Sequence, residues 1–138
     1  MAKDCLFCAI IAGNIPSSKV YEDEQVFAFL DLNPCAKGHT LIVPKFHAET
    51  VLELPKEYGA SLIHATQRIG KALMEELNAT GFNSVQNNFA SAGQVIFHAH
   101  WHIVPRFEGD GLFDIPQGKY TSQDEMTALA QALAARTS

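Results

Sequence analysis

The chain has 138 residues, a length typical of one domain, and 47% of them are apolar against 18% charged, which supplies a hydrophobic core and argues against intrinsic disorder. The formal net charge of −5 argues against a protein that wraps duplex nucleic acid, because contacts with phosphate groups supply most of that affinity. The longest wholly apolar run, 5–12, is far shorter than the roughly 20 residues of a membrane span and nothing resembles a signal peptide, so we expect one cytoplasmic domain over 1–138 that binds no membrane.

The N-terminal half predicts a short helix followed by three strands. An apolar segment ends at Gly13 and is followed by Pro16, which stops a helix. Two short apolar segments flank a polar turn, the pattern of a β-hairpin, and a β-branched segment that ends at Pro44 follows a loop with Pro34 and Gly38. The expected elements are a helix over 5–13, strands over 19–21, 25–30 and 39–43, a hairpin turn over 22–24 and a loop over 31–38.

The C-terminal half predicts two helices with strands between them. Pro55 opens the longest helical pattern, because proline is tolerated in the first turn of a helix, and Asn78 and Gly81 end it. Ser122 and Glu125 have the spacing of a capping box at the start of the last helix. The expected elements are strands over 82–87 and 94–104, a turn over 109–111, and a last helix over 122–136 with an apolar stripe of Met126, Leu129, Ala130 and Leu133.

The order of these elements indicates the fold class. The chain contains five or six expected strands and two or three expected helices, and the strands do not alternate strictly with helices. We therefore expect an α+β fold with a mainly antiparallel sheet.

Three histidines alternate with apolar residues in the segment 98–105. If this segment is a strand, His98, His100 and His102 project from one face, and the apolar residues between them project from the other and suit burial against a helix. Three interpretations are open: a solvent-exposed polar face, a metal site that uses two of the imidazoles, or nucleophilic and acid–base chemistry on an anionic substrate. In the third, one imidazole attacks while its neighbours donate hydrogen bonds to anionic oxygens.

Two of the three cysteines have the spacing Cys5-x-x-Cys8. In a reducing compartment this spacing indicates metal or redox chemistry before a structural disulfide. Two thiolates alone do not complete a tetrahedral zinc site, and the alternative is a pair of buried apolar thiols.

The His-x-His-x-His pattern resembles the signature of the histidine-triad (HIT) family of nucleotide hydrolases and transferases, in particular its short bacterial members. Other segments are similar to that family as well, so the resemblance covers about 4–107. It implies a HIT-like fold, with a mainly antiparallel five-stranded sheet, a long helix and a C-terminal helix. The similar segments are 4–16, 20–23, 29–31, 38–47, Asn87 and 92–94.

The resemblance implies a role for each histidine of the signature. His100 corresponds to the nucleophile, which would attack the α-phosphorus of a purine nucleotide and form a covalent nucleotidyl-histidine that water then hydrolyses. His102 corresponds to the residue that contacts the phosphoryl oxygens, and His98 to one that supports His100. His39 is similar to a further histidine that lies close to the triad.

The resemblance also implies the residues that bind the nucleotide. Gln94 and Asn87 correspond to residues at the phosphate, and Asp31 to the carboxylate that accepts the ribose hydroxyls; the alternative for all three is a polar loop, turn or strand-end residue. The chain departs from the family at Val95, where many members have a serine or threonine. The hydroxyl donor is therefore missing, although the backbone N–H of Val95 remains.

A structural zinc ion and a homodimer are further implications of the resemblance. In some bacterial-type members two histidines complete the metal site begun by the cysteine pair. The corresponding ligands are Cys5, Cys8, His47 and His98. Zinc would then have a structural role and support His98, and no cofactor would be required for catalysis itself.

We therefore expect an enzyme that cleaves a phosphoramidate or phosphoanhydride at the α-phosphorus of a purine nucleotide, as a phosphoramidase does. One alternative is a hydrolase of dinucleoside polyphosphates. Another is a nucleotide-binding regulatory protein without catalysis, which the missing hydroxyl at Val95 leaves open.

Overall fold

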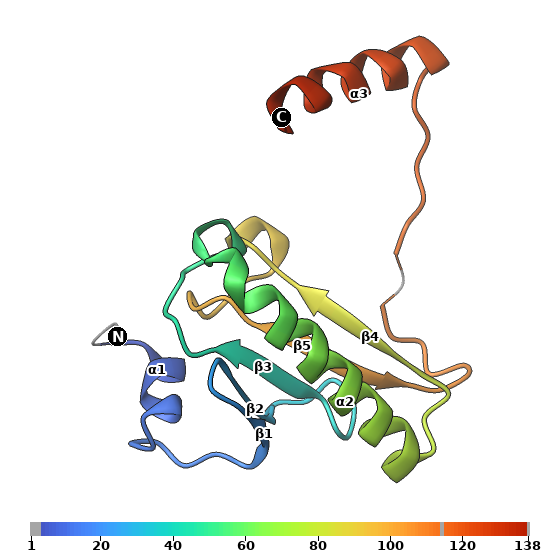
Figure 1. Cartoon of the computed structure of the whole chain (residues 1–138). Helices are drawn as coiled ribbons and strands as arrows, with labels where there is room; N and C mark the ends of the chain where they lie inside the picture. The colour runs from blue at the N-terminus through green and yellow to red at the C-terminus, as the bar shows by residue number, and fades with distance from the viewer. Residues whose placement is uncertain (1–3, 114, 138) are drawn as a thin grey trace.

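The computed structural model describes residues 4–113 and 115–137. Its centre is a five-stranded sheet in the order β1-β2-β3-β5-β4, in which each neighbouring pair is antiparallel (Figure 1). The α+β class and the antiparallel sheet expected from the sequence are thus confirmed. The strands are β1 (Lys19–Glu22), β2 (Val26–Leu30), β3 (Thr40–Pro44), β4 (Gly81–Gln86) and β5 (Trp101–Arg106); the helices are α1 (Leu6–Ile11), α2 (Gly59–Leu77) and α3 (Gln123–Thr137), with short 3₁₀ turns at Val51–Glu53, Lys56–Tyr58 and Ala90–Ala92.

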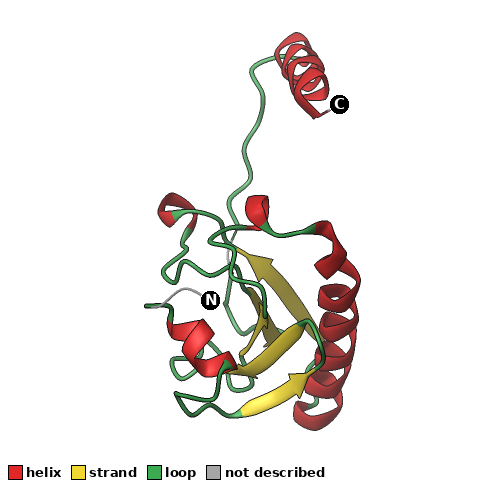
Figure 2. Ribbon diagram, turned by 60° about the vertical axis from the view of Figure 1, so that its left-hand side comes forward, coloured by secondary structure: helices red, strands yellow, loops and turns green. Residues whose placement is uncertain are grey.

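Helices cover both faces of the sheet, which is why β2 and β3 are apolar along nearly their whole length. Helix α2 packs on one face, and α1 lies on the other (Figures 1 and 2). Alternate residues of the strands therefore enter two separate cores. The buried core on the α2 face comprises Val26, Ala28, Ile42, Ile103, Leu62, Ala65, Ile69 and Leu73. The core on the α1 face comprises Phe7, Ile10, Phe27, Phe29, Leu41 and Val43.

The strand expected over 94–104 is shorter than the sequence pattern indicates. Pairing with β3 and with β4 ends at Trp101, so 94–100 run as an irregular segment. One backbone bond, from the N–H of Ala99 to the carbonyl of Ala48 at 2.7 Å, joins this segment to the residues that follow β3. Side chains supply further bonds: His98 Nε2 donates to the carbonyl of Pro44, 2.8 Å away, and Gln94 Nε2 donates to the carbonyl of Glu49, 2.6 Å away. Likewise, the expected start of the long helix at Pro55 is a 3₁₀ turn, and α2 begins at Gly59.

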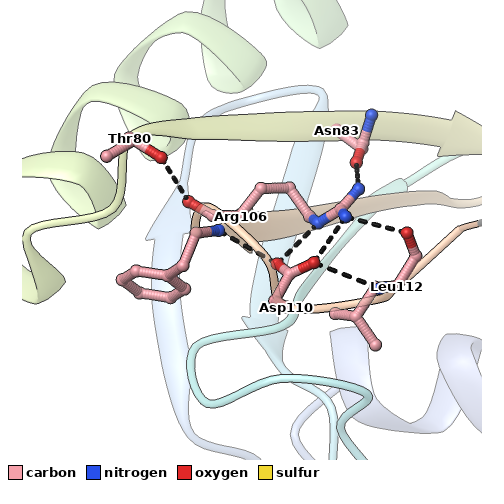
Figure 3. Close-up of polar contacts among 6 residues, drawn as sticks. Thr80, Asn83, Arg106, Asp110 and Leu112 are labelled. Atoms are coloured by element: carbon pink, nitrogen blue, oxygen red, sulfur yellow. Dashed lines mark hydrogen bonds and ion pairs between the residues drawn. The ribbon is translucent and has the colours of Figure 1, made fainter.

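A cluster of hydrogen bonds around Arg106 fixes the segment that follows β5 (Figure 3). The guanidinium donates to both carboxylate oxygens of Asp110, at 2.9 and 2.6 Å, and to Asn83 Oδ1 on β4, at 2.6 Å. A fourth bond joins it to the carbonyl of Leu112, 2.8 Å away. We call this set the Arg106 clasp; it holds the 107–112 turn against the edge of the sheet.

Helix α3 stands away from the sheet in both views (Figures 1 and 2), and none of its described residues is buried. The helix predicted from the capping box is confirmed, with the N–H of Glu125 donating to Ser122 Oγ at 3.1 Å. Its apolar stripe is exposed, however, with Leu129 at 45% and Leu133 at 53% of full exposure. No helix in the described part of the chain is long and apolar enough to cross a membrane.

Candidate functional site

An apolar cleft of about 420 Å³ opens on the α1 face of the sheet, and His100 and His102 reach into it. Asp31 and Asn33 are polar residues at its wall. Its size and composition suit a flat aromatic ligand with one polar end. The apolar side chains that line it are Leu6, Phe7, Ile10, Ile15, Pro16, Phe29, Leu32, Leu41, Val95 and Ile96.

A backbone carbonyl fixes the proton on the imidazole of His100. His100 Nδ1 lies 2.8 Å from the carbonyl oxygen of His98, so Nδ1 carries the proton and donates it. Nε2 is therefore left with a lone pair. Burial lowers the pKa of His100, which keeps the ring neutral near pH 7 and its lone pair available as a nucleophile.

A chain of hydrogen bonds gives the neighbouring His102 the opposite tautomer, with the proton on Nε2 instead of Nδ1. The backbone N–H of Cys35 donates to His39 Nδ1 at 3.2 Å, so the proton of His39 is on Nε2. That nitrogen donates to His102 Nδ1 at 2.9 Å, which places the proton of His102 on its own Nε2. Burial, with His100 and His39 close by, lowers the pKa of His102 to about 4.

The two rings thus present complementary atoms side by side, with centroids 4.9 Å apart. His100 offers a lone pair and His102 offers an N–H donor. A nucleophile next to a donor is what displacement at an electrophilic centre with anionic oxygens requires. Asp31 Oδ2 lies 3.7 Å from His39 Nε2, and its Oδ1 accepts the backbone N–H of Asn33 at 2.9 Å.

The four predicted metal ligands form a second cluster, which includes the ring of His98. The ligand atoms of Cys5, Cys8, His47 and His98 all lie within 4.8 Å of one another. His98 Nδ1 is 3.3 Å from Cys5 Sγ, 3.6 Å from Cys8 Sγ and 3.2 Å from His47 Nδ1. Zinc bonds of about 2.3 Å to sulfur and about 2.0 Å to nitrogen place tetrahedral ligand atoms roughly 3.3–3.8 Å apart, so the set fits zinc.

His98 presents the atom that a metal needs. Its Nε2 donates to the carbonyl of Pro44, so the lone pair of Nδ1 faces the two sulfurs and His47. Burial lowers the pKa of His98 to about 4. His98 therefore belongs to both clusters: its ring faces the cysteines, and its carbonyl fixes the proton of His100.

Gln94 and Asn87 do not line the cleft in this structure. Gln94 is 3% exposed, and its amide binds the carbonyls of Glu49 and Ile96 and the backbone N–H of Phe89. The last of these bonds holds Phe89, whose φ of 73° is a strained left-handed conformation. The side chain of Asn87 lies next to Gly93: a Cβ atom added to Gly93 would be 3.5 Å from Asn87 Nδ2. The phosphate roles expected for both residues remain predictions.

The structure adds two features to the site that the sequence pattern did not indicate in full. The ring of Phe7 lies edge-on to both His98 and His100, with its centroid 5.9 Å from that of His98 and 5.0 Å from that of His100, so one apolar side chain contacts a member of each cluster. The backbone N–H groups of Val95 and Ile96 donate no hydrogen bond within the described part of the chain, and both residues line the cleft. The sequence leaves the N–H of Val95 as an expected donor, and the structure adds that of Ile96.

Comparison with protein families shows a match to a HIT domain over 12–109. Protein hit of Bacillus subtilis is 50% identical over 112 residues, which are 80% of this chain and 77% of that protein. Adenylylsulfatase HINT3 of Arabidopsis thaliana is 43% identical over 113 residues, covering 82% of this chain and 57% of that protein. Adenosine 5′-monophosphoramidase HNT1 of Candida albicans is 38% identical over 106 residues, covering 74% and 70%.

Solved structures are similar over nearly the whole chain. A Streptococcus mutans protein is 44% identical, with a TM-score of 0.92 over 100% of this chain and 88% of that one. A zinc-bound histidine-triad protein of Mycobacterium smegmatis is 38% identical, with a TM-score of 0.76 over 96% of this chain and 97% of that one.

Proposed function

The chain belongs to the histidine-triad family, and from this premise we propose that it is a nucleotide hydrolase that works through a covalent nucleotidyl-histidine at His100. The family match and the hydrolase names of two relatives support nucleotide hydrolysis in general. One observation carries the proposed role of His100. The His98 carbonyl holds the proton on Nδ1 of His100, which leaves the lone pair of Nε2 free on a ring that lines the apolar cleft.

The proposed reaction has two displacements at the α-phosphorus. In the first, the lone pair of His100 Nε2 forms a bond to phosphorus, the bond from phosphorus to the leaving group breaks, and the leaving atom takes a proton from solvent. In the second, water attacks phosphorus and gives up a proton, and the bond to Nε2 breaks with its electron pair returning to the ring. Splitting the reaction in this way lowers each barrier.

The cleft offers a partner for each part of a nucleotide. The apolar wall around Phe29 suits the flat base, and Asp31 accepts two ribose hydroxyls. The Nε2–H of His102 and the free N–H groups of Val95 and Ile96 donate to the phosphoryl oxygens, where negative charge gathers in the transition state. These backbone donors are available although the side chain of Val95 supplies no hydroxyl, so one side-chain hydrogen bond to the phosphate is missing.

We propose that Cys5, Cys8, His47 and His98 hold a structural zinc ion and that catalysis requires no cofactor. The donor set supports this, because two thiolates and two imidazoles are ligands that zinc accepts readily. Zinc would cross-link the start of the chain to the segment that follows β3. It would also hold the ring of His98 beside the carbonyl that binds His100.

Turnover of two substrates, each with a His100→Ala variant, tests the proposal. We expect hydrolysis of adenosine 5′-phosphoramidate with a higher kcat/KM than that of diadenosine polyphosphates, and a loss of both activities in His100→Ala. His64→Ala is the matched control, because His64 is exposed on α2 away from the cleft. A higher kcat/KM on the dinucleotide would favour the polyphosphate hydrolase. Nucleotide binding without any His100-dependent turnover would favour the regulatory protein.

A further inference from the structure

The cysteine–histidine cluster has a half that solvent reaches and a half that it does not. Cys5 and His47 are partly exposed, and both line a surface hollow of about 390 Å³. Cys8 is 2% exposed and His98 is fully buried. A small solute therefore reaches the first cysteine of the pair but not the second.

The two sulfurs of the cluster are placed to join. Cys5 precedes α1 as its N-cap, and Cys8 lies one turn later and donates its N–H to Cys5 Sγ at 3.3 Å. Both sulfurs are directed at His98 Nδ1, 3.3 and 3.6 Å away, and they lie within 4.8 Å of each other. The Cys-x-x-Cys spacing is the one at which thiol oxidoreductases form a reversible disulfide. Because Cys5 lies outside the helix in an extended conformation, joining the sulfurs does not require α1 to unwind.

On these grounds, and resting on the zinc site proposed above, we propose that Cys5 and Cys8 are a redox modification site, at which a hydroperoxide forms a reversible disulfide and thereby displaces the zinc ion. Disulfides that form in reducing compartments are mostly transient ones of this kind. Cys35 takes no part, because it lies outside the cluster.

The proposed oxidation has two steps and moves two electrons. The thiolate of Cys5 attacks hydrogen peroxide, so that a sulfur–oxygen bond forms, the oxygen–oxygen bond breaks and hydroxide leaves. The thiolate of Cys8 then attacks the sulfur of this sulfenic acid, so that the disulfide forms and a second hydroxide leaves. Each sulfur loses one electron, the peroxide gains two, and the hydroxides take protons from solvent. Both thiolate ligands are thereby lost.

This site is coupled to the catalytic histidine by two contacts. Phe7 lies between the two cysteines in the chain, and its ring contacts the rings of both His98 and His100. The carbonyl of His98 also fixes the proton of His100. Because oxidation removes the metal from His98 and shifts the residues around Phe7, we expect it to lower nucleotide hydrolysis, with a kcat/KM about tenfold below that of the reduced enzyme.

Peroxide treatment of the zinc-loaded Cys35→Ser variant tests the site, because Cys5 and Cys8 are then the only thiols in the chain. We expect the intact mass to fall by about 2 Da, the mass of the two hydrogens lost from the reduced thiols. Peptide mapping should find the two cysteines linked, and a chromogenic chelator should detect the released zinc. Dithiothreitol with added zinc should restore the mass, the zinc content and the kcat/KM of the reduced form.

The double variant Cys8→Ser with Cys35→Ser is the matched control. It keeps Cys5 but has no second thiol to close the disulfide. Its mass should therefore rise by about 16 or 32 Da, as one or two oxygens are added to Cys5, and dithiothreitol should not reverse the larger increase.

The outcomes separate this site from the functions proposed above. Added oxygen without a disulfide in Cys35→Ser, or a disulfide that leaves the zinc bound, would overturn the redox site while leaving the hydrolase intact. Reduced protein without zinc would overturn the zinc site and the redox site together. If the reduced enzyme shows no turnover that depends on His100, the hydrolase fails, and the mass and zinc measurements still decide the redox site.

Discussion

The protons of the imidazoles at this site are fixed by backbone groups outside the rings. The carbonyl of His98 fixes His100, the carbonyl of Pro44 fixes His98, and the N–H of Cys35 fixes His39 and, through it, His102. Each ring has two nitrogens and one proton, so one backbone partner decides which nitrogen is left for chemistry. In the proposed mechanism, residues of one type thus serve as a nucleophile, a donor and a metal ligand.

At the residue scale, we expect the ring of His102 to stay neutral at pH values well below 6.5, the ordinary pKa of histidine, because burial lowers its pKa to about 4. Between these values the unfolded chain binds the proton and the folded chain does not, so the free energy of unfolding falls as the pH drops from 6.5 towards 4. Denaturation by urea over this range, with the ring titrated by NMR, measures both effects.

His102→Gln is the matched variant for this titration. Glutamine does not titrate, so the fall in the free energy of unfolding below pH 6.5 should be smaller in the variant. A His102 midpoint at or above 6.5 in the folded protein would show that His39 and burial do not hold the ring neutral.

At the scale of elements, the cysteine–histidine cluster joins α1 to the sheet. Cys5 caps α1 and accepts the N–H of Cys8, and His47 follows β3. We expect one zinc ion per chain and a fall in Tm of at least about 5 °C in Cys8→Ser, since a loss of 1–2 kcal/mol shifts Tm by roughly that much. Metal analysis and thermal unfolding measure these quantities.

Cys35→Ser controls for the loss of a thiol, because Cys35 is an exposed free cysteine outside the cluster. It should retain the zinc and the Tm of the wild type. Equal zinc content in Cys8→Ser and Cys35→Ser would mean that the cluster does not hold the metal.

The Arg106 clasp sets where the C-terminal segment leaves the sheet. Its hydrogen bonds hold the pKa of Asp110 well below the usual range, because Arg106 and two backbone N–H groups bind the charged carboxylate. In Asp110→Asn we expect faster amide exchange over 107–112 and unchanged exchange in β2 and β3. Hydrogen exchange with mass spectrometry resolves the two regions, and Asp124→Asn on exposed α3 is the control. Unaltered exchange over 107–112 would contradict the role of the clasp.

The fold class and most element positions could be predicted, because the continuous apolar segments of β2 and β3 reflect a sheet covered on both faces and the helical spacing of α2 reflects its one buried face. The pattern failed over 94–100. It indicated a strand there, but His98 and Gln94 bind the backbone carbonyls of Pro44 and Glu49, which lie about fifty residues earlier. Contacts of that kind depend on the tertiary fold and leave no local period.

The metal ligands of the site could be predicted from the sequence, whereas the contacts of Gln94 could not. The family resemblance indicated Cys5, Cys8, His47 and His98 as ligands, and the structure brings them together. The resemblance could not show that the side-chain amide of Gln94 binds backbone groups of the loop that contains Val95, because only the folded backbone brings those partners close. The stripe on α3 predicted a helix correctly but not that its apolar side would face solvent.

At the scale of the whole molecule, several surfaces are left for a second copy. Strand β4 is an edge of the sheet, and α3 extends from the body with its apolar stripe exposed. Unpaired edges and exposed apolar stripes favour association. We expect a homodimer, which light scattering after size-exclusion would show as about 30 kDa, twice the chain mass of 15.1 kDa. A 15 kDa species at micromolar concentration would contradict this.

The most direct test of the proposed mechanism is to trap the covalent intermediate. The enzyme is mixed with adenosine 5′-phosphoramidate, quenched within the first turnovers and digested, and the modified residue is located by mass spectrometry. We expect one adenylyl group on His100, absent in His100→Ala and discharged as adenosine monophosphate when the quench is delayed. Turnover with no adenylyl group on any histidine, or an adenylyl group on His102 instead, would contradict the assignment of His100 as the nucleophile.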